Sequence, residues 1–463
     1  MKWKKAAAAT LAAVMTVSLA ACGGGDKKES GGGEASDVKY ADIKLGEDYT
    51  DLKAEIKLLT NRTDMMDADY AGKNWDAYLE EFNKEYPDIK VEVEGITDYA
   101  EDSLLRLQGG DWGDIMMIPE VDKSDLSTYF LSYGDVDSVS EQVKYPNRWL
   151  YDGEVYGIPC TVVGRGIVYN KKVFEQAGIT ETPKTPEEFI ADLKAIKEKT
   201  DAIPLYTNYA AGWTMGAWDD YTAVTATGDA KYRNQELAHT KDPFTDPGNG
   251  AGAYNVYKIL YDAVAEGLTE DDFSTTDWEG SKSMLNSGQV ACMVLGSWAY
   301  PQMQQAGDTP EDVGYMPFPM TVDGTLYSPA DEDYCFGINA DTDADKQTAA
   351  MVFVKWMTEK SGYSYNEGGL PLAVGDEEFP EVYQEFIDNS VEFISNEPAV
   401  EGEEDLLNEM NSESELMLGA GGNDKVQAIV EHAANNDMSF DDIMNEWNQK
   451  WSDAQENLGV EVK

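Results

Sequence analysis

The sequence predicts an α/β protein whose helices pack on largely parallel sheets in two domains. Short apolar runs alternate along the chain with segments whose apolar residues recur at helical spacing, a pattern typical of α/β layers. The chain has 463 residues, more than a single hydrophobic core usually supports. Hydrophobic residues make up 42% of it, which is enough for two cores.

Three strands and one helix are predicted in the first part of the chain. Residues 56–60 form an apolar run, and residues 75–82 carry aromatic and apolar side chains at helical spacing. Apolar and charged residues alternate over 89–93, which predicts a half-buried strand. Residues 115–118 are all apolar and end at Pro119, which predicts a buried strand.

The clearest helix signal begins at Thr185. Thr185 suits the N-cap, Pro186 suits the first helical position, and Glu188 completes a capping box. A later helix is predicted over about 345–360. Beyond about residue 377 the chain is predicted to be mostly helical.

The N-terminus has the features of a secretory signal peptide over residues 1–21, with a positive start, an apolar centre and small residues at its end. The last three of these residues and Cys22 resemble a bacterial lipobox. We therefore expect Cys22 to be lipidated and to anchor the protein at the outer face of the cell membrane. An ordinary signal peptide whose cleavage site contains a cysteine is the alternative. Residues 22–48, rich in glycine and charge, are predicted to be a flexible linker.

The charge balance excludes two classes of partner. The formal net charge is −53, and such a surface repels nucleic acid phosphates and anionic lipid headgroups. No run beyond the signal peptide approaches the roughly 18 apolar residues of a membrane span. We therefore expect no nucleic acid partner and no membrane contact other than the lipid anchor.

The sequence carries no signal for a metal or a cofactor. Cys160, Cys292 and Cys335 remain beyond the lipobox, an odd number that allows at most one disulfide and has no metal-ligand spacing. His239 and His432 are the only histidines and lie far apart in polar surroundings. The acidic run at 341–345 lacks the glycine and the terminal glutamate of a calcium-binding loop.

Four stretches, taken in order, resemble the extracellular solute-binding proteins of ABC importers, the sugar-binding group that includes maltose-binding protein. They are residues 75–93, residues 152–159 with 168–189, residues 287–298, and residues 336–339 with 349–356 and 369–371. The resemblance implies a type II two-lobe fold, in which each lobe is a mostly parallel sheet flanked by helices and a hinge joins the lobes.

The resemblance also implies the division of the chain. The first lobe would comprise residues 49–160 plus 316–358, and the second lobe residues 161–315 plus 359–463. The chain would cross between the lobes near 160–163, 313–316 and 358–362. Glycines just after the first crossing suit a hinge, since glycine accommodates backbone change easily; an ordinary turn explains them equally well.

Ligands of α/β proteins bind outside the carboxyl ends of the strands. This rule selects a set of candidate ligand-binding residues. The family resemblance adds residues near the hinge and before the 336–339 strand, where members of the family often line the cleft. Together these are Asn61, Arg62, Asp64, Glu120, Asp122, Arg165, Tyr209, Trp213, Trp298, Asp331 and Glu332.

Trp298 is the strongest candidate, because it follows a buried apolar run and occupies the position where the family places a stacking aromatic ring. A tryptophan that packs between the lobes is the alternative for it and for Trp213. Arg62 and Asp64 could form a salt bridge on a loop instead. Asp331 and Glu332 could instead be two of many solvated surface acids.

Aromatic platforms among acids and amides favour a carbohydrate ligand. Sugar C–H faces stack on aromatic rings, and sugar hydroxyls bond to charged partners. We expect a monomeric binding protein that delivers an oligosaccharide to permease subunits, with no catalytic residues and no cofactor. A secreted glycosidase or an adhesion lipoprotein is the alternative, although serine-hydrolase, zinc-protease and Cys-x-x-Cys motifs are absent from the sequence.

Overall fold

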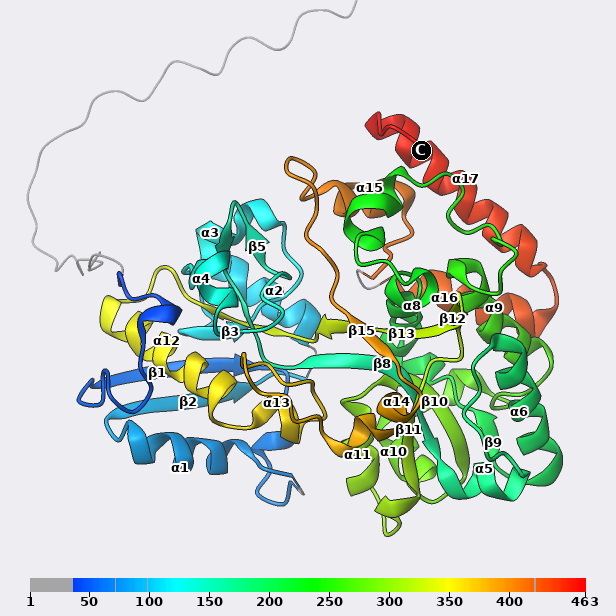
Figure 1. Ribbon diagram of the computed structural model, residues 1–463, viewed down its shortest axis with the longest axis horizontal. Coiled ribbons are helices and arrows are strands. Elements are labelled where there is room, and N and C mark those ends of the chain that lie inside the picture. Colours follow the sequence, from blue (N-terminus) through cyan, green and yellow to red (C-terminus); the bar gives the residue numbers. More distant parts are fainter. Residues whose placement is uncertain (1–35, 71, 98, 420–421) are drawn as a thin grey trace, which may run out of the picture.

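The computed structural model of the chain describes residues 36–70, 72–97, 99–419 and 422–463. Two lobes lie side by side, each built around its own β-sheet (Figure 1). The predicted signal peptide, the predicted lipidation site Cys22 and the linker up to residue 35 lie outside the described residues. None of the described helices has both the length and the apolar character needed to cross a membrane.

The first lobe contains a five-stranded sheet in the order β2-β1-β3-β14-β7. Its central strands β1 to β3 are parallel, whereas β14 and β7 run antiparallel to their neighbours. The bounds are β1 (Ala54–Thr60), β2 (Ile89–Gly95), β3 (Ile115–Met117), β7 (Ile158–Pro159) and β14 (Cys335–Ile338). The strands predicted at 56–60, 89–93 and 115–118 are therefore confirmed.

Helices cover the first sheet, and a small second sheet extends the lobe. The helices are α1 (Trp75–Glu85), α2 (Tyr99–Gly109), α3 (Leu126–Tyr129), α4 (Val136–Ser140) and α12 (Ala344–Glu359), and the small sheet contains β4 (Gly134–Asp135), β5 (Leu150–Tyr151) and β6 (Glu154–Val155). Phe82 of α1 stacks edge-on against Phe353 and Trp356 of α12. Both predicted helices thus contribute to one core.

The second lobe contains a seven-stranded sheet with the path β12-β13-β8-β10-β9, to which β11 and β15 add. Its strands are β8 (Val162–Asn170), β9 (Ile203–Leu205), β10 (Val290–Gly296), β11 (Val313–Pro317), β12 (Thr321–Val322), β13 (Thr325–Glu332) and β15 (Glu392–Ile394). Only the pairs β9–β10 and β13–β15 are parallel. The prediction of mostly parallel sheets is therefore wrong for this lobe, because β8 runs antiparallel to β10, β11 and β13.

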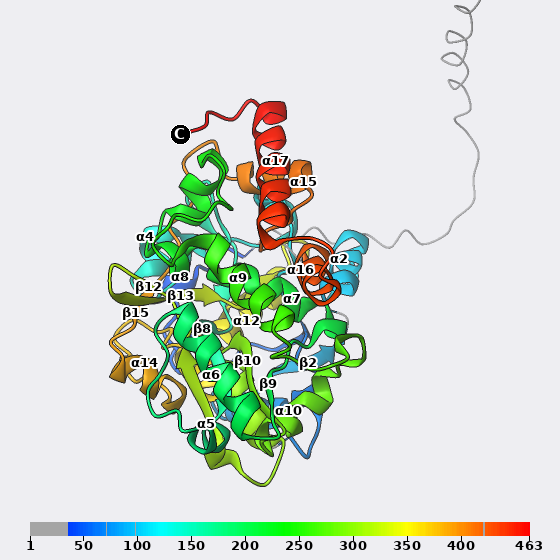
Figure 2. The same cartoon turned by 90° about the vertical axis from the view of Figure 1, so that its right-hand side faces the viewer.

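The helices of the second lobe pack around this sheet, and the long C-terminal helix α17 rises at one end (Figure 2). They are α5 (Lys171–Ala177), α6 (Pro186–Lys199), α7 (Trp213–Gly216), α8 (Val224–Thr227), α9 (Gly252–Ala265), α10 (Trp278–Asn286), α11 (Ala299–Gln305), α14 (Gln384–Asp388), α15 (Leu406–Ser414), α16 (Asn423–Asn435) and α17 (Phe440–Leu458). The short helix α13 (Tyr363–Asn366) follows the first-lobe helix α12.

The start of α6 shows the predicted cap. The Glu188 backbone N–H donates to Thr185 Oγ1 at 3.2 Å, and Pro186 occupies the first helical position. The Glu188 carboxylate accepts a hydrogen bond from the Lys184 backbone N–H at 2.7 Å, one residue before the amide of an ideal capping box. Phe189 and Ile196 of this helix are fully buried in the second-lobe core.

Two of the predicted lobe boundaries differ from the structure. Tyr40 and Ile43 are buried in the first-lobe core, so this lobe begins before residue 49 and the predicted linker includes residues that pack. Residues 316–332 lie in the second lobe, because β11 and β13 both pair with β8. The second passage between the lobes therefore lies at 333–334, between β13 and β14, rather than near 313–316.

The remaining passages follow β7, at residues 160–161, and α12. Figure 1 shows the long strand β8 and the strand β13 extending beside each other at the junction of the lobes. The three described cysteines, Cys160, Cys292 and Cys335, are buried and unpaired. The junction is therefore built from extended strands without a covalent cross-link among the described cysteines.

Candidate functional site

Three tryptophans form a cluster on the second lobe. Trp213 begins α7 after β9, Trp278 begins α10, and Trp298 precedes α11 directly after β10. Their ring centroids lie 5.0 Å apart for Trp213–Trp278, 5.5 Å for Trp213–Trp298 and 5.7 Å for Trp278–Trp298. Trp213 is 39% exposed, so its ring offers free surface beside two half-buried neighbours. Such a surface suits the apolar face of a sugar.

Gly296, the last residue of β10, connects this cluster to the charged part of the site. A Cβ at this position would lie 2.6 Å from Trp298 Nε1 and 3.0 Å from Arg165 Nη1. The indole and the guanidinium therefore converge over the glycine, and any side chain there would displace one of them. The predicted site residues Trp298 and Arg165 are neighbours for this reason.

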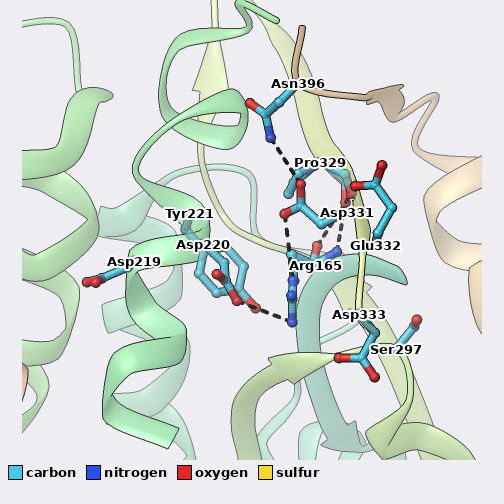
Figure 3. Close-up of polar contacts among 12 residues, drawn as sticks. Arg165, Asp219, Asp220, Tyr221, Ser297, Pro329, Asp331, Glu332, Asp333 and Asn396 are labelled. Atoms are coloured by element: carbon cyan, nitrogen blue, oxygen red, sulfur yellow. Dashed lines mark hydrogen bonds and ion pairs between the residues drawn. The ribbon is translucent and has the colours of Figure 1, made fainter. Parts of the chain in front are cut away.

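Arg165 lies on β8 between two carboxylates (Figure 3). Its Nη1 is 3.2 Å from Asp220 Oδ2, and its Nε is 3.9 Å from Asp331 Oδ2. Asn396 donates through Nδ2 to Asp331 Oδ1 at 3.0 Å. We call Arg165, Asp220, Asp331 and Asn396 the Arg165 floor.

Burial governs the charges of this floor. It raises the pKa of Asp331, which is 9% exposed, and the positive charges of Arg165 and Arg233 oppose this only in part. Burial alone would lower the pKa of Arg165, but Asp220 and Asp331 together raise it. The guanidinium therefore stays charged beside acids that are poorly solvated.

Two more acids follow Asp331 where the chain passes between the lobes. Burial raises the pKa of Glu332 to about 7. It also raises the pKa of Asp333, while Arg165 of the second lobe and Arg148 and Arg62 of the first lobe all act to lower it. Asp333 therefore lies close enough to arginines of both lobes for their charges to affect its pKa. The acidic run thus lies at the junction of the lobes, where Asp331 and Glu332 are buried.

The first lobe contributes an ion-pair network after β1. Arg62 donates to both oxygens of Asp64 at 2.9 Å and to Glu367 Oε2 at 2.7 Å, and it also bonds to the Tyr70 hydroxyl at 3.0 Å. Glu367 follows α13 and its side chain is almost fully buried. The loop after β1 is therefore tied to the third passage between the lobes.

A charge on the second lobe also affects the pKa of the Asp64 carboxylate. Burial would raise its pKa, but the hydrogen bonds and charge of Arg62 lower it, and the charge of Lys282 on α10 lowers it further. Lys282 itself lies over the Trp278 ring, with Nζ 4.9 Å from the centroid. The loop after β1 and the tryptophan cluster therefore face each other across the lobe junction.

Several buried polar atoms at this junction have no hydrogen-bond partner within the described residues. They are Asn61 Oδ1, Arg165 Nε, Glu332 Oε1 and Asn396 Oδ1. Buried polar groups are nearly always paired in native proteins, so each of these atoms needs a partner from water or from a ligand. Three acceptors and one donor match the hydroxyl groups of a carbohydrate, which both donate and accept.

The structure does not bring all predicted site residues together. Glu120 is exposed and forms an ion pair with Arg148 at 2.6 Å. Asp122 is exposed and its backbone carbonyl accepts a hydrogen bond from Asp125. The ring of Tyr209 lies 4.7 Å from that of Phe273 in a tilted arrangement, and its hydroxyl donates to Glu431. Arg148, the partner of Glu120, donates through Nη1 to the backbone carbonyls of Glu332 and Asp333, so Glu120 lies near the second passage between the lobes.

Sequence reasoning missed other residues of the site: Trp278, Asp220, Asp333, Glu367 and Asn396. The rule about strand ends does not select Trp278, because it begins a helix, yet it is only half-buried and belongs to the tryptophan cluster. Asp333 could have been found, since it continues the run of acids from Asp331. Asp220, Glu367 and Asn396 carry no local signal, because only the folded chain brings them to the junction.

Within the described ranges, no group of three or more His, Cys, Asp or Glu side chains is arranged to hold a metal ion. The chemistry that the site offers is therefore hydrogen bonding, charge and aromatic stacking.

Two lobes with aromatic and charged residues at their junction define the class of two-lobed solute-binding proteins. The sequence profile of bacterial extracellular solute-binding proteins matches residues 34–363, and the chain belongs to this family. The fold is the type II fold that the sequence predicts.

The most informative comparisons are with solved structures from Bifidobacterium animalis subsp. lactis. A manno-oligosaccharide-specific solute-binding protein in complex with mannotriose is 54% identical, with a TM-score of 0.88 over 91% of this chain and 99% of that chain. A binding protein of an ABC transporter in complex with mannobiose is also 54% identical, with a TM-score of 0.89 over 92% and 100%. The multiple sugar-binding protein of Streptococcus mutans is 27% identical over 64% of this chain and 71% of that protein.

Proposed function

We propose that this protein captures a manno-oligosaccharide between its lobes and delivers it to the permease of an ABC transporter. The observation that carries the proposal is the tryptophan cluster beside the Arg165 floor. The cluster offers stacking surface, and the floor offers charged partners for hydroxyl groups. The 54% identity to mannobiose- and mannotriose-binding proteins supports the choice of sugar.

In this proposal the site binds the sugar and does not hydrolyse it. Two carboxylates of a glycosidase flank the scissile bond with one of them free to donate a proton. Here Asp220 and Asp331 lie on either side of Arg165, which forms ion pairs with both carboxylates. The matched family and the relatives named above are binding proteins, which favours transport over hydrolysis.

The anchor and the partners are part of the same proposal. Lipidated Cys22 would hold the protein at the outer face of the membrane, and the flexible linker would keep the body near the permease at high effective concentration. Ser36, the first described residue, bonds through its backbone N–H to Gln347 Oε1 at 2.8 Å on α12. The linker would therefore join the first lobe, and the protein would act as a monomer.

Calorimetry with the purified protein tests the ligand. Mannobiose and mannotriose are expected to bind and to raise the melting temperature, whereas raffinose is expected to bind more weakly. Chromatography of the incubated sugars is expected to show no cleavage products. Absence of binding by both mannose oligosaccharides, or their hydrolysis, would overturn the proposal.

A further inference from the structure

A small cavity in the second lobe adjoins the Arg165 floor. Its volume is about 20 Å³, and Asp220 and Asp331 belong to both its lining and the floor. A water-sized group needs roughly 10–15 Å³ of such volume. The cavity therefore accommodates one or two non-hydrogen atoms and excludes a whole sugar ring.

The lining of the cavity is polar on one part and apolar on another. Asp219, Asp220, Asp331 and Asn396 contribute carboxylate and amide groups and Arg233 contributes a guanidinium, whereas Val224 and Leu418 contribute aliphatic surface. A group that fits such a lining has one polar atom and one carbon atom. A hydroxymethyl group has this composition.

One atom of the cavity lining lacks a partner within the described part of the chain. Asn396 donates through Nδ2 to Asp331, which leaves its buried Oδ1 as a free acceptor. A hydroxyl group can donate a hydrogen bond to such an acceptor.

The cavity wall includes a part of the chain that the family profile does not match. The match ends at residue 363, whereas Asn396, Leu407 and Leu418 lie beyond it. Asn396 follows β15, which pairs with β13 and so places the amide against Asp331. The C-terminal part of the chain thus closes the cavity.

We propose that this cavity is a specificity pocket for the exocyclic hydroxymethyl group of one hexose unit of the ligand. The hydroxyl donates to Asn396 Oδ1, and the methylene carbon packs against Val224 and Leu418. The proposal rests on the proposed carbohydrate function and deepens it. Pentoses and 6-deoxyhexoses lack this group and would leave this buried acceptor unpaired, so the site would reject them.

Calorimetry with the wild-type protein tests the pocket directly. The ligands are mannobiose and its two analogues in which the 6-hydroxyl of one or the other unit is replaced by hydrogen. At least one analogue is expected to bind about fivefold or more weakly than mannobiose, because a buried hydrogen bond is lost. Smaller losses for both analogues would overturn the pocket while leaving the proposed function intact. Failure of the wild type to bind mannobiose and mannotriose would instead overturn the proposed function, and the pocket with it.

A variant then tests whether the hydroxymethyl group lies in this cavity. Asn396→Ala is expected to weaken mannobiose binding about fivefold or more while leaving the affinity for the sensitive deoxy analogue unchanged. Asn389→Ala is the matched control, since Asn389 is an amide of the second lobe that bonds to the Glu385 carbonyl away from the floor. Equal weakening of both ligands by Asn396→Ala would overturn the pocket.

Discussion

Truncation of Trp213 tests whether the tryptophan cluster stacks on the ligand. Trp213→Ala removes the most exposed ring of the cluster, which is 39% accessible. The ring contacts Trp278 edge-on at 5.0 Å and Trp298 at 5.5 Å, so its loss also removes two aromatic pairs. Such a pair contributes about 0.5–1.5 kcal/mol beyond its buried area, so the folded protein is expected to remain stable.

The size of the effect follows from the exposed area. A tryptophan side chain can bury about 250 Å², so 39% exposure leaves about 100 Å² for a ligand to cover. At about 25 cal/mol per Å², complete coverage contributes about 2.5 kcal/mol, and coverage of one face contributes about 1 kcal/mol. The dissociation constant is therefore expected to rise between about 5-fold and 70-fold.

Calorimetry with mannotriose measures this change, and Tyr49→Ala provides the control. Tyr49 is 38% exposed and lies before β1, at the opposite end of that strand from the Arg62 loop. The control is expected to leave the affinity unchanged. An affinity of Trp213→Ala within about twofold of the wild type would refute the stacking argument. An intermediate affinity for Trp213→Phe would support it, since phenylalanine restores part of the area.

Four further predictions concern the neighbouring parts of the site. Trp298→Ala is expected to weaken mannotriose binding at least as strongly as Trp213→Ala in calorimetry, because Trp298 also contacts the space above Gly296; unchanged affinity would remove it from the site. Burial raises the pKa of Glu332 from 4.5 to about 7, so stability is full below pH 4.5 and falls as the pH rises through 7. This loss amounts to up to about 3 kcal/mol of unfolding free energy at pH 8, and Glu332→Gln is expected to abolish it. Urea denaturation measures the change, and a pH profile of stability that is the same in the variant and the wild type would contradict the prediction. Glu367→Ala removes the buried partner of Arg62 and is expected to destabilise the protein by about 3 kcal/mol. Asp64→Ala removes the more exposed partner and is expected to cost less than about 1 kcal/mol. Equal effects of the two variants in urea denaturation would contradict this prediction. Saturating mannotriose is expected to reduce the radius of gyration in X-ray scattering as the lobes close, and superimposable curves would count against a hinge.

Local patterns predicted most of the regular structure. The strands at 56–60, 89–93 and 115–118 and the helix after Thr185 each carry their own signal of hydrophobic period or capping, so they were found without knowledge of the fold. Strand direction in the second lobe could not be found in this way. It depends on β8, whose antiparallel neighbours come from positions more than 100 residues farther along the chain.

The candidate site, like the fold, was predicted only in part from local sequence patterns. Arg62 follows the strand predicted at 56–60 and Trp298 follows a buried apolar run, and the rule about carboxyl ends of strands selected both of them together with Trp213. The same rule selected Glu120 and Asp122, which are exposed. Their role in binding stays a prediction, because the rule identifies an edge of a sheet and not the direction of a side chain.

The sequence by itself determined that the chain is an α/β protein of two lobes, that its surface is strongly acidic, and that aromatic and charged residues follow its strands. These are properties of local order and composition, which each segment carries alone. Only the tertiary structure decided that Asp220, Asp331 and Asn396 surround Arg165 and adjoin a cavity of about 20 Å³. The longest of these contacts in sequence joins Arg165 to Asp331, 166 residues apart, and their distances depend on how β8, β13 and β15 pair.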